Sequence, residues 1–522
     1  MAGQGPSAPR PPTRWWPAWL ILGMGGTAIA WIWLVRDIQR QDRNLQTAGV
    51  LLITLTLLFL WSVLFSRFRW RTRLLLLGGL GALLTGLPAF LEIGGVTGDL
   101  LPIVRWRWRT PRSRAPAPPL PQEMVVAPTP EAPSTNDYPQ FLGPSRNAIV
   151  AGPPLARDWE AHPPSEIWRV AVGAAWSGFA VAGAFAVTQE QDGQNEKVVC
   201  YDLRSGKTLW SQADPARYFT TIAGEGPRAT PTIVGNRVLT VGATGIMNCL
   251  DLKSGARLWT KNILTDNHSH VPEWGLSGSP LVVGNLVVAS AGGKSERSLV
   301  AYDLATGGFV WGGGTDGAGY SSPFLATLAQ AGQILIFNAH SLAAHDPQSG
   351  VLLWSHPWKA GHPHVAMPVA LPGDRVLVSS GYGTGSELLR ISREAGGPWG
   401  VERVWKSIRL KAKFTNVVPK NGFIYGLDDG ILVCLDTATG EQKWKEGRYG
   451  HGQVILVGDL LVIMAESGEV VLVDPVPDRH RELTRFRALR GKTWNPPALA
   501  GNWLLVRNDS EAACYRLPVE GK

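Results

Sequence analysis

Charged residues are scarce in this chain of 522 residues, at 17% of the sequence, whereas apolar residues make up 45%. That apolar share excludes wholesale disorder and can supply a large hydrophobic core. Cysteine is also scarce: the four cysteines are never adjacent, and no Cys-x-x-Cys-His motif is present, which excludes a covalently attached haem. Phosphate-binding glycine loops, nucleophile elbows and zinc-hydrolase helix motifs are missing as well. No sequence motif therefore assigns an enzyme class by itself.

Lysine is absent from residues 1–136, which hold 14 arginines and six acidic residues, a net charge of +8. Residues 137–522 hold 36 basic and 35 acidic residues, so nearly all of the chain's net charge of +9 lies in its N-terminal part. Because this excess flanks apolar segments, it favours membrane anchoring over a phosphate-binding face. We predict no nucleic-acid partner.

Three long apolar runs occupy residues 1–110, at about 15–35, 45–66 and 74–91. Each is long enough, or nearly so, to cross a hydrocarbon core of about 30 Å. A single cleaved signal peptide does not explain three such runs. We predict a membrane anchor of two to three helices in contact with lipid, in which the third run is the weakest because it is glycine-rich and closely followed by Glu92 and Asp99.

The side of the membrane stays open. With the N-terminus inside, six arginines flank the inner ends of the spans and eight flank the outer ends, which decides nothing under the positive-inside rule. The run Arg105-Trp-Arg-Trp-Arg109 could bind lipid headgroups, although an ordinary flank of the last span is the simpler interpretation. Residues 111–136 contain eight prolines and predict an extended linker to a water-soluble body at 137–522.

A nine-residue pattern, Asp-x-x-Ser/Thr-Gly-x-x-x-Trp, recurs in that body with a mean spacing of about 47 residues. It ends at Trp210, Trp259, Trp311, Trp354 and Trp444, and a stretched version ends at Trp405. Asp can bond its own backbone and Gly accepts a positive φ, so the pattern predicts a tight hairpin with the tryptophan on the following strand. Three more apolar runs precede each copy, which predicts a four-stranded propeller blade.

Counting gives eight units, so we predict an all-β, eight-bladed β-propeller over residues 137–522, preceded by transmembrane α-helices. The seventh unit, at about 452–488, places Phe486 near the tryptophan position, and the eighth, at 494–517, lacks its fourth strand. We expect the segment around Trp168 to supply that strand and close the ring, which removes the open sheet edges. The tryptophans expected to dock between neighbouring blades are Trp168, Trp210, Trp259, Trp311, Trp354, Trp405 and Trp444.

These repeats resemble the pyrroloquinoline-quinone (PQQ) repeat family over roughly residues 137–520, and the lead-in segment DYPQFLGPSRNAIV (137–150) resembles that of bacterial PQQ-like propellers of unassigned function. Two branches of the family share the repeat. Quinoprotein alcohol dehydrogenases bind PQQ and Ca²⁺ on the propeller axis, whereas the outer-membrane protein assembly factor B type is a scaffold without cofactor. The resemblance favours the second branch, because the vicinal disulfide of the first is missing here.

The four cysteines occupy one position of the repeat, at Cys200, Cys249, Cys434 and Cys514. Residues at the same position of different blades should lie too far apart for a disulfide bond. We therefore expect four small, buried hydrophobic residues.

Polar and aromatic residues interrupt the apolar pattern just before each first strand. First strands of a propeller line the central channel, so equivalent positions should meet at one mouth. The predicted ligand-binding residues there are Trp176, Arg228, Trp274, Tyr320, Lys413, His451, Lys492 and Trp494. Cations beside indole rings suit a planar or anionic ligand. The simpler alternative is that polar residues solvate the channel and satisfy strand ends.

No catalytic residue and no metal ligand is assigned. Glu225, Glu273, Asp316, Asn416 and Asn495 lie at suitable positions in the repeat for a Ca²⁺ site, but they do not form a recognisable family constellation. We expect no cofactor, with PQQ and Ca²⁺ as the alternative.

The leading functional hypothesis is a non-catalytic binding or scaffold module, held in a bacterial inner membrane with its propeller on the periplasmic, extracytoplasmic side. A protein partner is expected on one propeller face. The alternatives are a PQQ-dependent alcohol dehydrogenase-like oxidoreductase and a small-ligand sensor. The sequence leaves the identity of partner or ligand and the oligomeric state open.

Overall fold

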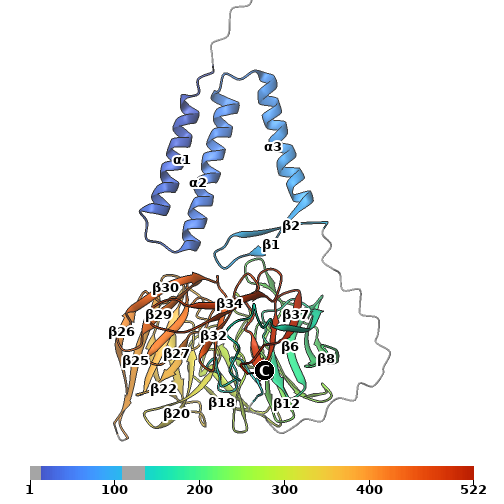
Figure 1. Ribbon diagram of the computed structural model, residues 1–522, viewed down its shortest axis with the longest axis vertical. Coiled ribbons are helices and arrows are strands. Elements are labelled where there is room, and N and C mark those ends of the chain that lie inside the picture. Colours follow the sequence, from blue (N-terminus) through green and yellow to red (C-terminus); the bar gives the residue numbers. More distant parts are fainter. Residues whose placement is uncertain (1–12, 109–135, 395, 522) are drawn as a thin grey trace, which may run out of the picture. The chain divides into compact units, whose positions relative to one another are not determined.

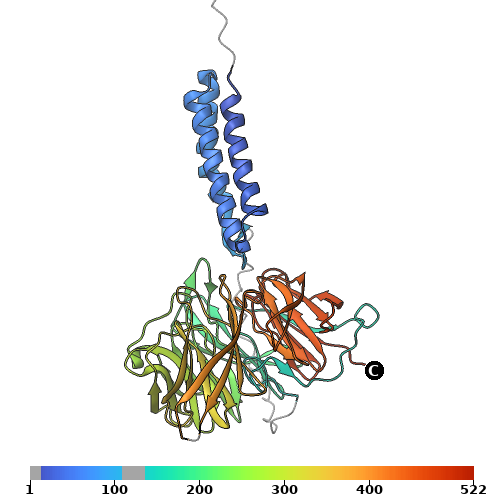
Figure 2. The same cartoon turned by 90° about the vertical axis from the view of Figure 1, so that its left-hand side faces the viewer.

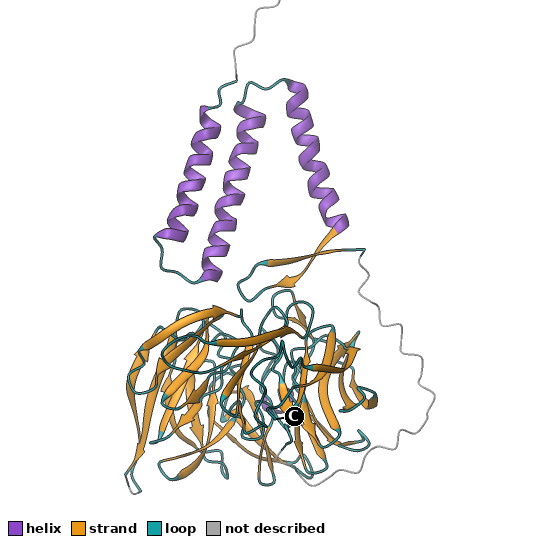
Figure 3. Ribbon diagram, viewed as in Figure 1, coloured by secondary structure: helices purple, strands orange, loops and turns teal. Residues whose placement is uncertain are grey.

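A computed structural model of the protein describes residues 13–108, 136–394 and 396–521. The chain divides into two compact units, Met1–Ala115 and Pro116–Lys522. The first is mainly helical and the second is built from strands (Figures 1 and 3). The linker predicted at 111–136 lies outside the described residues, apart from Asn136.

Three helices dominate the first unit: α1 (Trp16–Leu34), α2 (Arg40–Leu60) and α3 (Trp70–Phe90). A π-helical turn at Trp61–Phe65 extends α2. All three helices are long and apolar enough to cross a membrane, which confirms helices of the predicted kind at all three apolar runs. Both α2 and α3 begin earlier than the predicted apolar runs, because each adds a polar first turn rich in arginine.

A β-hairpin follows α3 directly, and the sequence analysis did not anticipate it. Strand β1 (Leu91–Val96) pairs antiparallel with β2 (Pro102–Trp106). The arginine- and tryptophan-rich run therefore begins as part of a strand rather than as an ordinary flank of the last span.

The second unit is built mainly from eight sheets, each with four antiparallel strands. Figure 2 shows these strands from the side. Blades 1 and 2 are β5 (Ala180–Ala182), β6 (Phe185–Asp192), β7 (Asn195–Asp202) and β8 (Thr208–Asp214), then β11 (Thr232–Val234), β12 (Arg237–Val241), β13 (Ile246–Asp251) and β14 (Arg257–Asn262). Blades 3 and 4 are β15 (Leu281–Val283), β16 (Leu286–Gly293), β17 (Arg297–Asp303) and β18 (Phe309–Gly313), then β19 (Phe324–Leu328), β20 (Ala331–Phe337), β21 (Ser341–His345) and β22 (Leu352–Pro357). A short hairpin of β9 (Phe219–Thr220) and β10 (Gly224–Glu225) lies between blades 1 and 2, and a 3₁₀ turn at Thr265–Asn267 between blades 2 and 3.

The remaining blades follow the same order. Blades 5 and 6 are β23 (Val369–Leu371), β24 (Arg375–Ser380), β25 (Gly385–Arg393) and β26 (Trp399–Ser407), then β27 (Val418–Lys420), β28 (Phe423–Asp428), β29 (Ile431–Asp436) and β30 (Gln442–Arg448). Blade 7 is β31 (Gln453–Val457), β32 (Leu460–Met464), β33 (Glu469–Val473) and β34 (Glu482–Arg487), with β3 (Ile149–Val150) added in parallel to β31. Blade 8 is β35 (Ala498–Ala500), β36 (Trp503–Arg507), β37 (Glu511–Arg516) and β4 (Ser165–Ala171).

The ring closes as predicted. Strand β4, from the start of the propeller, pairs with β37 at its end, and Trp168 lies opposite Cys514 in the register. This pairing ties the two ends of the second unit together and confirms the eight-bladed propeller.

The repeated pattern forms the joint between neighbouring blades. In blade 2 the Asp251 carboxylate accepts hydrogen bonds from the backbone N–H groups of Lys253 and Ser254, and Gly255 has φ +70°. The indole of Trp210, from blade 1, packs on Gly255 and donates its N–H to the Leu252 carbonyl at 2.8 Å. The same packing joins Trp168 to Gly206, Trp259 to Gly307, Trp311 to Gly350 and Trp405 to Gly440, although the indole N–H of Trp311 has no hydrogen-bond partner among the described residues.

Two pattern tryptophans depart from this arrangement. Trp354 donates to the Gln333 side chain of its own blade at 2.6 Å, because blade 5 has the stretched pattern and offers no equivalent glycine. Trp444 donates to the Val476 carbonyl of blade 7 at 2.9 Å.

All four cysteines are buried and free, which agrees with the prediction. Each lies directly opposite a docking tryptophan in the register, as Cys200 does with Trp210. Burial raises the pKa of Cys249 and Cys434 to about 11 and that of Cys514 to about 12, so these thiols stay protonated and unreactive.

Substitution of Gly255 by Ala tests the joint between blades. A Cβ at Gly255 would lie 2.5 Å from the Trp210 indole, whereas a Cβ at Gly235, which also has a positive φ, meets nothing within 4 Å. Backbone strain should cost Gly235→Ala about 1–2 kcal/mol. Gly255→Ala should lose about 1–3 kcal/mol more, because the indole must move. Denaturant titration measures both free energies of unfolding, and equal losses would show that the contact is not tight.

Candidate functional site

A belt of hydrogen bonds links the inner segments of the blades around the axis. The Thr230 hydroxyl accepts from the Gly178 N–H at 3.0 Å, and the Ser279 hydroxyl accepts from the Thr230 N–H at 2.9 Å. The Ser322 hydroxyl continues the series by accepting from the Ser279 N–H at 2.9 Å. These bonds join blades 1 to 4 through side chains that the inner strands place at equivalent positions.

Amides close the belt on the other side. The Asn416 Oδ1 accepts from the Met367 N–H at 2.9 Å, and the Gln453 amide donates to the Phe414 and Trp494 carbonyls at 2.7 and 3.0 Å. The Asn495 amide then donates to carbonyls of blade 1, at Ala175 and Ser177. Polar side chains thus satisfy strand ends here, as the simpler sequence interpretation expected.

The eight predicted ligand-binding residues all precede this belt in their segments, and the structure divides them into two groups. Trp176, Lys492 and Trp494 form the centre of the first group. The Lys492 Nζ lies 4.0 Å from the ring centroid of Trp494 and 4.7 Å from that of Trp176, and the two rings are 4.9 Å apart. All three side chains are half-buried, so part of each is open to a ligand.

Phe414 connects this centre to Lys413 and His451. Its ring lies 5.1 Å from Trp494 and 5.6 Å from His451, and the Lys413 Nζ is 5.1 Å from its centroid. Lys413 and His451 are each 3% exposed, so they lie beneath the surface that the sequence analysis expected them to line. We call Trp176, Lys413, Phe414, His451, Lys492 and Trp494 the axial cluster.

Two further residues support the axial cluster and were missed from the sequence. The Glu466 carboxylate accepts from the Trp494 indole at 2.9 Å and from the His451 backbone N–H at 3.0 Å. The ring of Tyr382 lies 4.9 Å from the Lys413 Nζ. Both residues belong to turns between later strands of a blade, where the repeat gave no signal.

Arg228, Trp274 and Tyr320 form the second group, on blades 2 to 4. The Arg228 guanidinium donates to the carbonyls of Trp274 at 2.8 Å, Gly224 at 3.0 Å and Ala223 at 3.2 Å. The Tyr320 hydroxyl accepts from the Trp274 N–H at 3.3 Å. Burial lowers the pKa of Arg228 to about 10. The N–H groups of Arg228 are used to bond these backbone carbonyls. The second group therefore stabilises the propeller and is less suited to binding a ligand.

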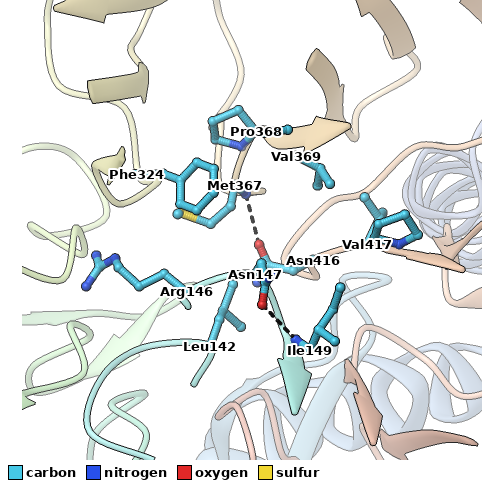
Figure 4. Close-up of a pocket in the computed structure, with 12 residues that line it drawn as sticks. Leu142, Arg146, Asn147, Ile149, Phe324, Met367, Pro368, Val369, Asn416 and Val417 are labelled. Atoms are coloured by element: carbon cyan, nitrogen blue, oxygen red, sulfur yellow. Dashed lines mark hydrogen bonds between the residues drawn. The ribbon is translucent and has the colours of Figure 1, made fainter. Parts of the chain in front are cut away.

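The lead-in segment crosses the axis at the other end of the inner strands. Its Pro139 carbonyl accepts from the Ile233 N–H at 2.7 Å, and the buried Arg146 donates to the Ser279 and Pro280 carbonyls, both at 3.0 Å. Along the chain, Ile233, Ser279 and Pro280 lie at or after the belt residues of their blades. The residues of the axial cluster lie before the belt residues of theirs. A cavity of about 60 Å³ lies between the lead-in segment and blades 4 to 6 (Figure 4). The lead-in segment therefore covers the end of the axis away from the axial cluster.

The five residues considered for Ca²⁺ do not fit such a site. The Glu225 carboxylate pairs with Arg217 at 2.9 Å, and that of Asp316 bonds His340 and Ser341, both at 2.7 Å. Asn416 and Asn495 are bonded within the belt, and Glu273 is exposed. Within residues 13–108, 136–394 and 396–521, no group of three or more His, Cys, Asp or Glu side chains could hold a metal ion. Four of the five candidates are thus already bonded to other groups of the protein, and the fifth is exposed.

One buried carboxyl group, Glu196, makes stability depend on pH. Burial raises its pKa from 4.5 to about 7, against the opposing effects of the Ala243 N–H and Arg228 and with a smaller contribution from Asp214. Between these values the folded protein holds a proton that the unfolded chain has released. The free energy of unfolding therefore falls as the pH rises from about 5 to about 8, by at most about 3 kcal/mol.

The Glu196→Gln variant should remove this dependence. At pH ~8 it should be more stable than the parent protein, and at pH ~5 nearly equal to it, because Gln resembles the protonated acid. Thermal melting across the pH range measures the difference. The Glu225→Gln variant, which changes an exposed ion pair, should keep the slope of the parent; an unchanged slope in Glu196→Gln would show that another group titrates.

Comparison in three dimensions finds quinohemoprotein alcohol dehydrogenases. Those of Comamonas testosteroni and Pseudomonas putida give TM-scores of 0.54 and 0.53 at 11% and 12% identity, each covering 74% of this chain and 81% of that one. BamB from Moraxella catarrhalis is 16% identical over 66% of this chain and 85% of that one, but its TM-score of 0.36 is too low to support a conclusion. At such identities the likeness shows the fold alone.

No curated protein matches the sequence. A family model described as outer membrane protein assembly factor BamB does match, at residues 160–271 and 194–446, which together span more than half of the chain. With the eight-bladed arrangement and the pattern tryptophans in place, the chain belongs to the PQQ-like β-propeller family that this BamB model represents.

Proposed function

We propose that this protein is a membrane-anchored, non-catalytic binding module whose propeller holds an acidic segment of a partner protein at the axial cluster. The observation that carries the proposal is the position of Lys492 between the indoles of Trp176 and Trp494. The ammonium group is fixed by two rings at 4.7 and 4.0 Å, so it is already oriented before a partner arrives.

The chemistry of the cluster suits a carboxylate beside an apolar side chain. Lys492 offers a charge-assisted hydrogen bond, and the half-buried rings of Trp176, Phe414 and Trp494 offer a flat apolar surface. The buried Lys413 adds positive charge from below. Tryptophan-rich patches with a fixed cation are typical of the few residues that dominate a protein interface.

Binding is better supported than catalysis at this position. The belt side chains that reach the axis are committed to joining blades, and the Glu466 carboxylate is used to hold Trp494 and the backbone of His451. The family model is described as an outer membrane protein assembly factor, which is a role in the assembly of other proteins. A scaffold role for this chain agrees with both observations.

A peptide titration tests the site. The probes are a capped, fluorescein-labelled peptide of alternating Glu and Phe, and its counterpart of alternating Gln and Phe, with the full chain in detergent. The Glu peptide should bind more tightly, and salt should weaken it. Lys492→Gln should raise its Kd about tenfold, because one hydrogen bond to a charged group contributes about 1.5–3 kcal/mol. Fluorescence anisotropy measures both constants.

Lys207→Gln is the matched control, since Lys207 is an exposed lysine in a blade 1 turn far from the axis in the repeat. It should leave the Kd unchanged. Equal binding of the two peptides, or an equal loss in both variants, would contradict the axial site. A small-ligand sensor would instead show a melting shift with small anions alone. Stoichiometric retention of PQQ with Ca²⁺, together with dye reduction by an alcohol, would overturn the non-catalytic assignment.

The proposed location is a bacterial inner membrane with the propeller on the extracytoplasmic side. Three helices that could each cross the bilayer are compatible with this location when the N-terminus lies in the cytoplasm, because an odd number of spans puts the two ends of the anchor on opposite sides. Alkaline phosphatase fused after residue 125 should therefore be active in a bacterial host, and a green fluorescent protein fused at the same position should be dark. The reverse result would place the propeller in the cytoplasm.

A further inference from the structure

The β1–β2 hairpin is fixed to the end of the third helix. Strand β1 starts at Leu91, the residue after α3 ends, and the Arg107 N–H donates to the Phe90 carbonyl at 2.7 Å. The rings of Phe90 and Trp108 lie 4.7 Å apart. No linker separates the hairpin from the helix, so it cannot lie far from the surface of any membrane that α3 crosses.

The tip of the hairpin is tied to the start of the second helix. Asp99 accepts from the Asn44 amide through its carbonyl at 2.9 Å, and its carboxylate lies 3.4 Å from the Arg40 Nε. Successive spans run in opposite directions, so the start of α2 and the end of α3 lie at the same end of the helices. Fixed at both positions, the hairpin runs across that end, in the direction of the membrane plane (Figure 1).

The pairing register gives the hairpin two different faces. Leu91 lies opposite Trp106 and Ile93 opposite Val104, whereas Glu92 lies opposite Arg105. Side chains alternate between the faces of a strand, so the four apolar residues share one face. Glu92, Arg105 and the half-buried Ile103 share the other face, and Arg107 follows directly after β2.

The apolar face is open: Ile93 is 62% exposed, Val104 56% and Trp106 60%. We propose that the hairpin lies in the membrane interface, with this face against the acyl chains and with Arg105 and Arg107 at phosphates of anionic phospholipids. The proposal rests on the membrane insertion contained in the proposed function.

Three physical arguments support a lipid surface as the occupant. Trp106 and Trp108 favour the depth of the headgroups, where tryptophan is enriched in membrane proteins. Arginine binds phosphate oxygens with a pair of parallel hydrogen bonds, and basic residues next to a span are drawn to anionic lipids. The free edges of a two-stranded hairpin need water, which excludes the hydrocarbon core and leaves the interface as the available depth.

Site-specific labelling of the full chain in nanodiscs tests the placement. The native cysteines are buried, so a single new surface cysteine can carry an environment-sensitive nitrobenzoxadiazole label. The variants are Val104→Cys on the apolar face, Glu92→Cys on the charged face, and Leu55→Cys on the exposed side of α2 as the control for insertion. The discs contain phosphatidylcholine with phosphatidylglycerol, with and without spin-labelled lipid.

The label at 104 should be quenched by spin-labelled lipid, and iodide in the water should quench it about threefold less than the label at 92. If the label at 55 is quenched by lipid but the label at 104 is not, the hairpin proposal fails and the membrane anchor stands. Protection of position 104 from both quenchers would mean that protein covers this face, which also overturns the proposal. Loss of lipid quenching at position 55 would overturn the anchor itself, and the hairpin proposal with it.

A second set of variants tests the phosphate contacts. Arg105→Gln and Arg107→Gln together should reduce lipid quenching at position 104 by about half in discs with phosphatidylglycerol, because the arginines hold the hairpin down. Arg390→Gln, which changes an exposed arginine of blade 5, is the control and should have no effect. Unchanged quenching in the double variant would overturn the role of the two arginines.

Discussion

The packing of an indole on a glycine of the next blade is the constraint on which the propeller depends. At this contact a tryptophan closes one sheet, and its N–H reaches a carbonyl of the neighbouring turn, as between Trp210 and Leu252 at 2.8 Å. The glycine must have no side chain and must accept a positive φ, so turn geometry and blade spacing are set by the same residue. Repetition of the contact fixes the angle between blades, closes the ring and brings the segments before the inner strands to one end of the axis.

Where the repeated pattern is incomplete, other parts of the chain supply the missing contacts. Blade 7 has Phe486 at the tryptophan position, and the lead-in segment adds β3 to the inner strand of that blade. The ring of Trp159, from the chain between β3 and β4, lies 5.5 Å from Phe486 and fills the space beside it. Between blades 4 and 5 the Trp354 indole N–H is satisfied inside its own blade, by the Gln333 side chain, and Trp354 packs in one hydrophobic cluster with Val376 and Leu389 of blade 5. The residues ahead of blade 1 therefore stabilise blades that lack the full repeat.

The fold could be predicted from the sequence because its determinants are local: a turn, a glycine and a tryptophan within nine residues. The candidate site could be predicted only in outline. Equivalent positions in the repeat identified which segments meet, but repeat position does not reveal whether a side chain is buried, as Lys413 is, or committed to carbonyls, as Arg228 is. Glu466 and Tyr382 come from turns that vary between blades, so no periodic signal marked them. The hairpin after α3 was missed because its alternation spans only a few residues beside a much longer apolar run.

Eight similar blades would present the same surface all around the axis. The axial cluster lies on only some of the blades, and this uneven distribution is what indicates a binding surface. The cluster comes from four consecutive blades: Lys413 and Phe414 lead into blade 6, His451 into blade 7, Lys492 and Trp494 into blade 8, and Trp176 into blade 1. Across the axis, Arg228 directs its donors at backbone carbonyls, and blades 2 to 4 offer framework contacts instead. A partner held at this end would therefore contact one half of the ring, and the joint between blades 8 and 1, made by Trp168 on Gly206, would lie within that half. The strand pairing that closes the ring is then also what keeps Trp176 beside Trp494, so that the integrity of the proposed binding surface depends on the closure of the fold.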